Sequence, residues 1–290
     1  MPQSPAIAFA FVAPALLFLA AILGWPLIQA VLLSLQDVRV IGSPGAFVGL
    51  ANYERILAAP EFWRAAGLSI VWVLANAVLQ TALALTAALV LNEKFPGVRV
   101  ARTWIIITWI VPTVVVVVIW RWLFSTSGGM INPLLIQFGI VERPVGFFAT
   151  PWTAMATLIF INSWRWFPFI ALMLLADLTR IPGDLYEAAH LDGAGAWSRF
   201  RYVTWPLLAP TLSVLAVIGT LLSFNVFDII WLLTAGGPAG GSRTLPVLIY
   251  ETAFKGYRLS EAATISVLAT LFLMAFAVIA TRTLERGETR

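Results

Sequence analysis

Cysteine is absent from this chain of 290 residues, and histidine occurs once, as His190. Without cysteine the chain can form neither a disulfide framework nor a thiolate metal site. A single histidine leaves no cluster of imidazole ligands for zinc or iron. We therefore expect no metal site and no metal-based catalysis on this chain.

Lysine is almost absent as well. Lys94 is followed by Phe95 and Lys255 by Gly256, so neither stands in the Gly-Lys-Ser or Gly-Lys-Thr of a phosphate-binding loop. We therefore expect that the chain binds no ATP through such a loop and holds no cofactor. A group of glycines without that lysine is expected to form a flexible loop at a helix end. These are Gly236, Gly237, Gly240 and Gly241.

Charged residues make up only 11% of the chain, whereas 60% of it is hydrophobic and the mean hydropathy is +0.91. This composition is typical of a protein that crosses a membrane several times. The net charge of +4 comes from basic residues in short loops between apolar segments, a pattern of membrane orientation. We expect membrane lipid around the chain and no nucleic acid as a partner.

Six apolar segments are long enough to span a bilayer, which takes about 20 helical residues. They cover residues 6–34, 68–91, 103–124, 152–176, 206–233 and 262–281. The first is expected to remain as a helix, because residues 1–5 carry no basic side chain and the apolar run is too long for a signal peptide. The sequence predicts an all-α membrane protein with a single transmembrane domain over residues 1–290.

Prolines inside these segments are expected to bend the helices, because proline leaves a backbone carbonyl without its partner. They are Pro14, Pro26, Pro112 and Pro168.

The distribution of Lys and Arg predicts the orientation. Nine lie in residues 92–102, 177–205 and the C-terminal tail, whereas seven are spread over the longer loops of the opposite side. Basic residues concentrate on the cytoplasmic side of a membrane. Both termini and the loop at 177–205 are therefore expected in the cytoplasm, with the chain in the inner membrane.

The polar stretch from Glu187 to Pro210 interrupts the apolar chain. Pro182 and Asp184, with Glu187 three residues later, predict a capped helix start, and the Asp-Gly at 192 and 193 predicts its end. A second short helix is expected over Ala196–Val203, before Pro206. We name residues 180–205 the coupling segment and expect a helix-turn-helix outside the membrane.

This stretch resembles the EAA loop of permease subunits of ABC importers, whose pattern is EAA, then DGA, then Phe and two prolines. Further blocks resemble the carbohydrate-uptake branch of that family, the maltose and glycerol-phosphate type. They read FVGLANY at 47–53, GGMINPLL at 128–135 and FNVFDIIWLLTAGGP at 224–238. The resemblance covers roughly residues 9–280 and implies six transmembrane helices of the ABC importer type.

The resemblance implies that the EAA loop docks on a separate ATPase. Its matching positions here are Glu187, Ala188, Ala189, Asp192 and Gly193. It implies two ATPase subunits that hold ATP and Mg, an extracytoplasmic solute-binding protein and a second permease subunit with its own EAA loop. The chain is then a translocation subunit and not itself an enzyme. The alternative to docking is that Glu187 only caps its helix.

Arg165 lies near the middle of the fourth apolar segment, where a charge costs at least about 2.5 kcal/mol and is expected to face a wet cavity or a partner. The family's sugar site is lined from this helix and from the helix after the EAA loop. Matched residue by residue, it implies a substrate site here at Arg165, Trp166, Phe169, Ser223 and Val226. The Arg-Trp pair departs from the small or aliphatic residues of some relatives, which favours an anionic or smaller solute.

Two alternatives remain open for Arg165: an ion pair with Asp228 or with a partner carboxylate, and a place in a water-filled lining without either role. Asp228 is expected near the outer end of the fifth span and therefore not level with Arg165, although the length of an arginine side chain can shorten the gap.

The predicted function is the permease subunit of an ATP-driven, binding-protein-dependent importer for a sugar or sugar-like solute. An ion-coupled carrier or a channel is the alternative, with Asp228 as its only intramembrane acid. An intramembrane enzyme would need a Ser and His pair or paired acids within the spans.

Overall fold

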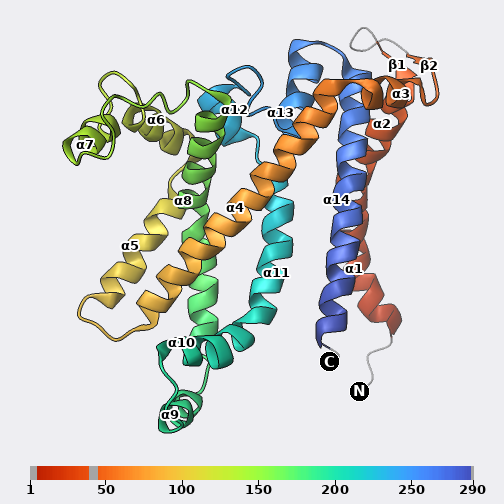
Figure 1. Ribbon diagram of the computed structural model, residues 1–290. Coiled ribbons are helices and arrows are strands. Elements are labelled where there is room, and N and C mark those ends of the chain that lie inside the picture. The colour runs from red at the N-terminus through yellow and green to blue at the C-terminus, as the bar shows by residue number, and fades with distance from the viewer. Residues whose placement is uncertain (1–4, 39–44, 289–290) are drawn as a thin grey trace. The chain divides into compact units, whose positions relative to one another are not determined.

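The computed structural model describes residues 5–38 and 45–288, most of which are helical (Figure 1). This confirms the predicted all-α class. The helices form two compact units, Met1–Ala65 with Leu248–Ala275, and Ala66–Val247 with Phe276–Arg290. Among the described residues, five helices are long and apolar enough to cross a membrane, and one bent pair of helices raises the number to six.

The first unit begins with an apolar helix over the predicted segment 6–34. α1 (Pro5–Leu19) continues through the π-helical η1 (Ala20–Gly24) into α2 (Trp25–Ser34). Pro26 is the second residue of α2, and a proline ring clashes with the carbonyl four residues before it. A π-turn at this place widens the helix and relieves the clash.

Short polar elements complete the first unit. β1 (Gln36–Asp37) pairs antiparallel with β2 (Ala46–Phe47), and α3 (Ala51–Ala58) follows. Asn52 of α3 donates hydrogen bonds to the carbonyl oxygens of Ser34 and Gln36, at 2.9 and 2.8 Å. η3 (Glu251–Lys255) precedes α14 (Leu259–Glu288). Glu261 of α14 accepts from Arg55 of α3 at 3.2 Å, which joins the two helices.

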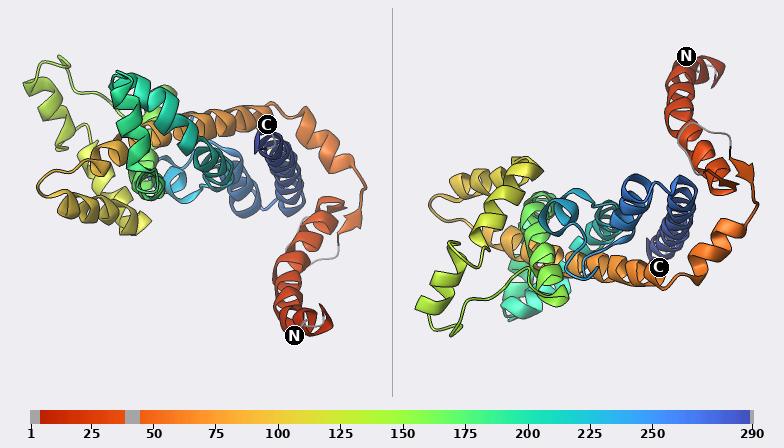
Figure 2. Two further views of the ribbon diagram at one scale, coloured as in Figure 1. Left: turned by 90° about the horizontal axis from the view of Figure 1, so that it is seen from below. Right: turned by 90° about the horizontal axis from the view of Figure 1, so that it is seen from above.

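The core of the second unit lies between α4 (Pro60–Asn92), α8 (Pro151–Leu178) and α11 (Trp205–Phe224). Ala84 and Ala88 of α4 and Ala171 of α8 are fully buried, and such small side chains let membrane helices approach closely. In Figure 1, α4 crosses α8, and Figure 2 shows the same helices from below and above. Leucines fill the remaining core, namely Leu91, Leu174, Leu175, Leu178 and Leu208.

The third predicted segment, 103–124, is not one straight helix. α5 (Val98–Ile110) and α6 (Thr113–Leu123) are bent by 96° at the break between them. Val111 is extended, with φ −61° and ψ 128°, and Pro112 follows. The residue before a proline avoids the helical region, so the helix ends there. The expected proline bend is present, but it is a full break. α7 (Ile131–Gln137) follows in the next loop.

The fifth predicted segment, 206–233, is also two helices, because α11 ends at Phe224 and α12 (Asp228–Thr234) begins after three residues. The carbonyl oxygen of Ser223 accepts from the Trp72 indole at 2.9 Å, and the side chain of Asn225 donates to Leu221 at 2.8 Å. Both carbonyls would receive backbone amides in a continuing helix. The Trp72 indole shares the Ser223 carbonyl with the backbone amide of Val226, at 3.2 Å, and the regular helical bonding ends there with α11. α13 (Leu245–Tyr250) follows.

Candidate functional site

The coupling segment contains α9 (Gly183–Leu191) and α10 (Ala196–Arg199), at the opposite end of the second unit from α12 (Figure 1). Glu187 and Ala188 lie on the second turn of α9 and are exposed, and Ala189 is half-buried. The helix has no buried residue, and large apolar side chains next to it face outward. Leu191 is 88% and Trp197 73% exposed. The segment therefore presents apolar side chains that none of the described residues covers.

The predicted acidic cap of α9 is wrong. Pro182 occupies the cap position without any side-chain cap hydrogen bond, and Asp184 is already inside the first turn. The helix starts earlier than expected because Pro182 has the fixed φ suited to the position before a helix, −58° here. Glu187 therefore lies within the helix, and the alternative in which its side chain only caps the helix is wrong as well.

The predicted turn after α9 is confirmed. Gly193 has φ +75°, in the left-handed region that glycine tolerates best. The amide of Ala194 donates to the Ala189 carbonyl at 2.9 Å, and that of Gly193 to the His190 carbonyl at 3.0 Å, which closes the helix end. A Cβ at Gly193 would meet no atom within 4 Å. The requirement for glycine therefore comes from the backbone conformation alone.

The second short helix does not stop before Pro206. α10 continues through the π-helical η2 (Phe200–Thr204) into α11, so that Ala196–Phe224 is one helix of 29 residues. Pro206 stands at the second position of α11, as Pro26 does in α2, and the π-turn accommodates it in the same way. Tyr186 of α9 and Thr204 of η2 share a hydrogen bond of 2.9 Å between their hydroxyls.

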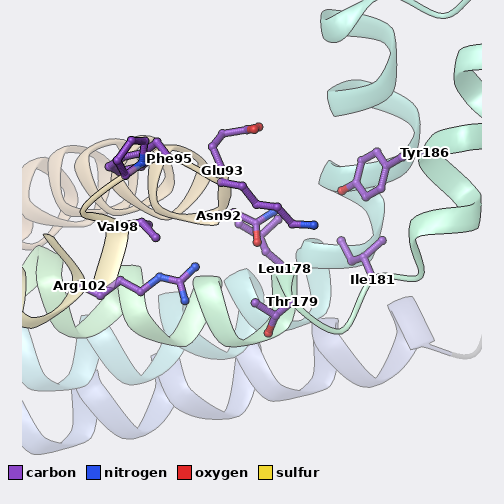
Figure 3. A pocket seen from close by; sticks show the side chains of 11 residues that line it. Asn92, Glu93, Phe95, Val98, Arg102, Leu178, Thr179, Ile181 and Tyr186 are labelled. Carbon is purple, nitrogen blue, oxygen red and sulfur yellow. The ribbon is translucent and has the colours of Figure 1, made fainter. Parts of the chain in front are cut away.

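Two clefts flank Tyr186. One, of about 780 Å³, lies between the α4–α5 turn and the start of the coupling segment, with Tyr186 and Ile181 on one side and Val98 and Arg102 on the other (Figure 3). The second, of about 670 Å³, is lined by residues from Leu89 to Thr204 that include Trp197. Arg102 donates to the Leu91 carbonyl at 2.7 Å and so closes the end of α4. Both clefts are lined by Tyr186, which directly precedes Glu187 on α9.

A small cavity of about 40 Å³ lies between α4, α8 and α11. Four of the five predicted substrate residues line it: Trp166, Phe169, Ser223 and Val226. The others in the lining are Gln80, Ile170, Leu215, Ile218, Gly219 and Leu222. The volume holds a few water molecules and is far below the several hundred cubic ångströms of a ligand pocket. The cavity is therefore closed in this conformation.

Arg165 does not line this cavity. Its guanidinium lies 3.8 Å from the carboxylate of Asp228, and 5.7 Å from the ring centre of Trp166. The Arg165 side chain is only 17% exposed, against 48% for Asp228. Its Nε atom is buried and has no hydrogen-bond partner among the described residues. The side chains of the two residues therefore meet, as the ion-pair alternative anticipated, and Asp228 does so from the start of the separate helix α12 instead of from α11.

A second arginine holds the other end of α12. Arg121 of α6 donates to the carbonyl oxygens of Leu232 and Leu233, at 2.6 and 3.1 Å. These carbonyls have no helical partner at the end of a seven-residue helix. α12 is therefore fixed at its start by Arg165 and at its end by Arg121. The sequence offered no signal for this role of Arg121, since the break in the fifth segment was not visible in the apolar pattern.

A buried polar network on α4 was also missed. Asn76 and Gln80 stand one turn apart inside the apolar segment 68–91, and both are buried, next to Asn162 and Ser163 of α8. Polar residues spaced by four within an apolar span are the signal that points to such a network. In the part of the chain that the structure describes, no group of three metal-ligating side chains is found.

Comparisons with known proteins agree on one family. Residues 80–289 match the family model described as "binding-protein-dependent transport system inner membrane component". A probable ABC transporter permease of Brucella suis is 33% identical over 99% of both chains. The trehalose/maltose transport system permease of Thermococcus litoralis is 38% identical, over 80% of this chain and 78% of that one. A chain of a bacterial alginate ABC transporter, crystallised with its alginate-bound periplasmic protein, has the same fold, with a TM-score of 0.84 at 22% identity over 97% and 94% of the two chains.

Proposed function

Because this chain belongs to the inner membrane components of binding-protein-dependent transport systems, we propose that it forms half of the pore of an importer for a carbohydrate. It is a multi-pass permease of the inner membrane, and its role is translocation. The single observation that carries the substrate proposal is the cavity between α4, α8 and α11, where aromatic rings meet a few polar groups. Sugars bind through aromatic contact with their apolar faces and hydrogen bonds to their hydroxyls.

The cavity agrees with the relatives. The permease of Thermococcus litoralis is named for trehalose and maltose, and this chain is 38% identical to it. The residues carried over from the family motif, Trp166, Phe169, Ser223 and Val226, come together at one place although they lie on two distant segments. We propose that they contact the solute once the cavity opens, and that Arg165 serves mainly as the partner of Asp228.

We further propose that α9 docks on an ATPase subunit through Glu187, Ala188 and Ala189, with Asp192 and Gly193 forming the turn that shapes the docking surface. The exposed apolar side chains of Leu191 and Trp197 support this, since surfaces of this kind mark interaction sites. ATP and Mg would be held by two such subunits. One coupling segment serves one ATPase, so a second permease with its own segment completes the pore, together with an extracytoplasmic solute-binding protein.

The orientation is part of the same proposal. Both termini and the coupling segment lie in the cytoplasm, as the distribution of Lys and Arg indicates. Residues 1–290 then act together as one permease domain. A reporter enzyme fused after Arg290 is expected on the cytoplasmic side of the inner membrane. A reporter found on the opposite side would overturn the orientation.

The test is transport by the reconstituted complex of both permeases, two ATPases and the binding protein. We expect uptake of maltose or trehalose into proteoliposomes only when both ATP and the binding protein are present. Matched vesicles with an ATPase that cannot hydrolyse ATP should take up none. Uptake that needs an ion gradient but no ATP would favour the carrier alternative and contradict the proposal.

A further inference from the structure

The cavity has one polar residue on α4 that no family motif singled out, Gln80. It is 4% exposed and lines the cavity together with the aromatic residues of α8. Polar side chains at this depth are costly and persist where they hold a partner or a solute. The question is which end of its amide faces the cavity.

The hydrogen-bond network around Asn76 answers this. The Asn76 amide nitrogen donates to the Trp72 carbonyl at 2.8 Å, which directs its Oδ1 atom away from that carbonyl. Oδ1 then accepts from the Asn162 amide at 2.8 Å and from the Ser163 hydroxyl at 3.1 Å. An oxygen in this position requires donors, and the Gln80 Nε2 atom is the third, at 3.2 Å.

The same constraint fixes Gln80. One N–H of the Gln80 amide donates to Asn76, which fixes the orientation of the amide and leaves its second N–H and its carbonyl oxygen, an acceptor, for further partners. No hydrogen bond of this oxygen is found among the residues that the structure describes. The network behind it consists of fully buried side chains, and a turned-over amide would place the Gln80 oxygen against the Asn76 oxygen, which is also an acceptor.

We infer that Gln80 is a specificity-determining contact that accepts a hydrogen bond from a hydroxyl of the solute. This rests on the proposed carbohydrate function and narrows it. A carboxylate or phosphate oxygen placed here would face another acceptor, whereas a hydroxyl can donate. The charge of Arg165 is already engaged by Asp228. The Gln80 oxygen therefore favours a neutral polyhydroxylated solute over the anionic one that the Arg-Trp pair suggests.

The experiment uses the complete importer in proteoliposomes, with maltose, trehalose and the singly deoxygenated derivatives of whichever sugar is taken up. For the wild type, one derivative should bind about tenfold more weakly than its parent, because it leaves the Gln80 oxygen unpaired. Methionine has a side chain of similar length without the oxygen. In Gln80→Met the parent sugar should bind as weakly as that derivative, so that the difference in affinity between the two sugars vanishes. Gln137→Met, on the exposed α7, is the matched control and should discriminate as the wild type does.

Loss of discrimination separates a contact from a structural role, since a general packing defect would weaken every sugar alike. If wild type transports a sugar and Gln80→Met still discriminates among its derivatives, the Gln80 inference fails while the proposed function stands. If the wild type transports none of these sugars, the proposed function fails and the inference fails with it.

A second variant covers the case in which Gln80→Met does not assemble. The chain has no cysteine, so Gln80→Cys introduces its single thiol. A transported sugar should slow the reaction of that thiol with a small methanethiosulfonate reagent several-fold, as a residue in the binding cavity requires. An equal rate with and without the sugar would overturn the inference.

Discussion

The guanidinium of Arg165 on α8 and the carboxylate of Asp228, the first residue of α12, lie 3.8 Å apart. They are 63 positions apart in the sequence and were expected at different depths. The pair connects a membrane-spanning helix to a short helix beside the closed cavity, and Asp228 lies two residues after Val226 of its lining. Its two members differ in burial, and that difference leads to an asymmetric prediction.

Asp228→Ala should damage the complex more than Arg165→Ala does. Removal of the carboxylate leaves a largely buried guanidinium without a partner, whereas removal of the guanidinium leaves a half-exposed carboxylate that water can solvate. We expect the melting temperature and yield of the purified complex to fall in the order wild type, Arg165→Ala, Asp228→Ala. The double alanine variant should recover part of the loss.

The same variants separate the two roles of Arg165. Exchange of the two residues should restore assembly if the pair is structural. A normal yield of Arg165→Ala together with abolished uptake would instead show that Arg165 contacts the solute.

Arg121→Ala should loosen the end of α12. The guanidinium satisfies two carbonyls there, and a cation at a helix end contributes about 0.5 kcal/mol when exposed. The expected result is faster hydrogen exchange of the α12 amides with little change in global stability. Arg143→Ala, at an exposed loop position, is the control. Unchanged exchange in Arg121→Ala would show that packing alone holds α12.

Gly193→Ala should reduce the coupling between ATP hydrolysis and transport, and Gly193→Asp should reduce it further. The φ of +75° costs a residue with a side chain about 1 kcal/mol, so the turn between α9 and α10 would relax. Gly195→Ala is the matched control, because Gly195 has an ordinary φ of −68° and equally open surroundings. The measurement is sugar taken up per ATP hydrolysed. Full coupling in Gly193→Asp at normal expression would contradict the docking proposal.

Asn76→Leu should destabilise the second unit by about 2 kcal/mol, because three donors lose their shared acceptor inside the membrane-spanning region. Thermal unfolding of the purified chain in detergent measures this. Thr86→Val on the same helix, whose exposed hydroxyl bonds only its own backbone, should change little. Equal melting temperatures for Asn76→Leu and Thr86→Val would mean that the network contributes no stability.

Local signals in the sequence were sufficient for the turn at Gly193 and for the apolar segments, since an Asp-Gly pair and a long apolar run act within a few residues. The breaks at Val111 and Phe224 differ in this respect. The first follows from the residue before Pro112, which sequence analysis treated as a bend. The second involves Trp72, which lies 151 positions before Ser223 in the sequence and donates to its carbonyl together with the Val226 amide. No local pattern contains that contact, so Asp228 was placed on the wrong helix.

The substrate residues show the same division. The family motif identified Trp166, Phe169, Ser223 and Val226, and the structure brings them to one cavity. Arg165 was included because a charged residue within a span is conspicuous. The position of α12 decides that its side chain meets Asp228 and does not line the cavity. Gln80 was missed because its meaning comes from Asn76 and from α8, and the sequence shows only two amides one turn apart.

The uninterrupted helix Ala196–Phe224 has a mechanical consequence. Its 29 residues, at about 1.5 Å each, make a stiff rod of roughly 40 Å with the coupling surface at one end and Ser223 at the other. A tilt of about 3° around its middle would carry Ser223 by about 1 Å. α12 would not follow, because the helix is interrupted at residues 225–227 and two arginines hold α12 in place. A displacement of α10 would then move the end of α11 relative to α12 at the edge of the cavity.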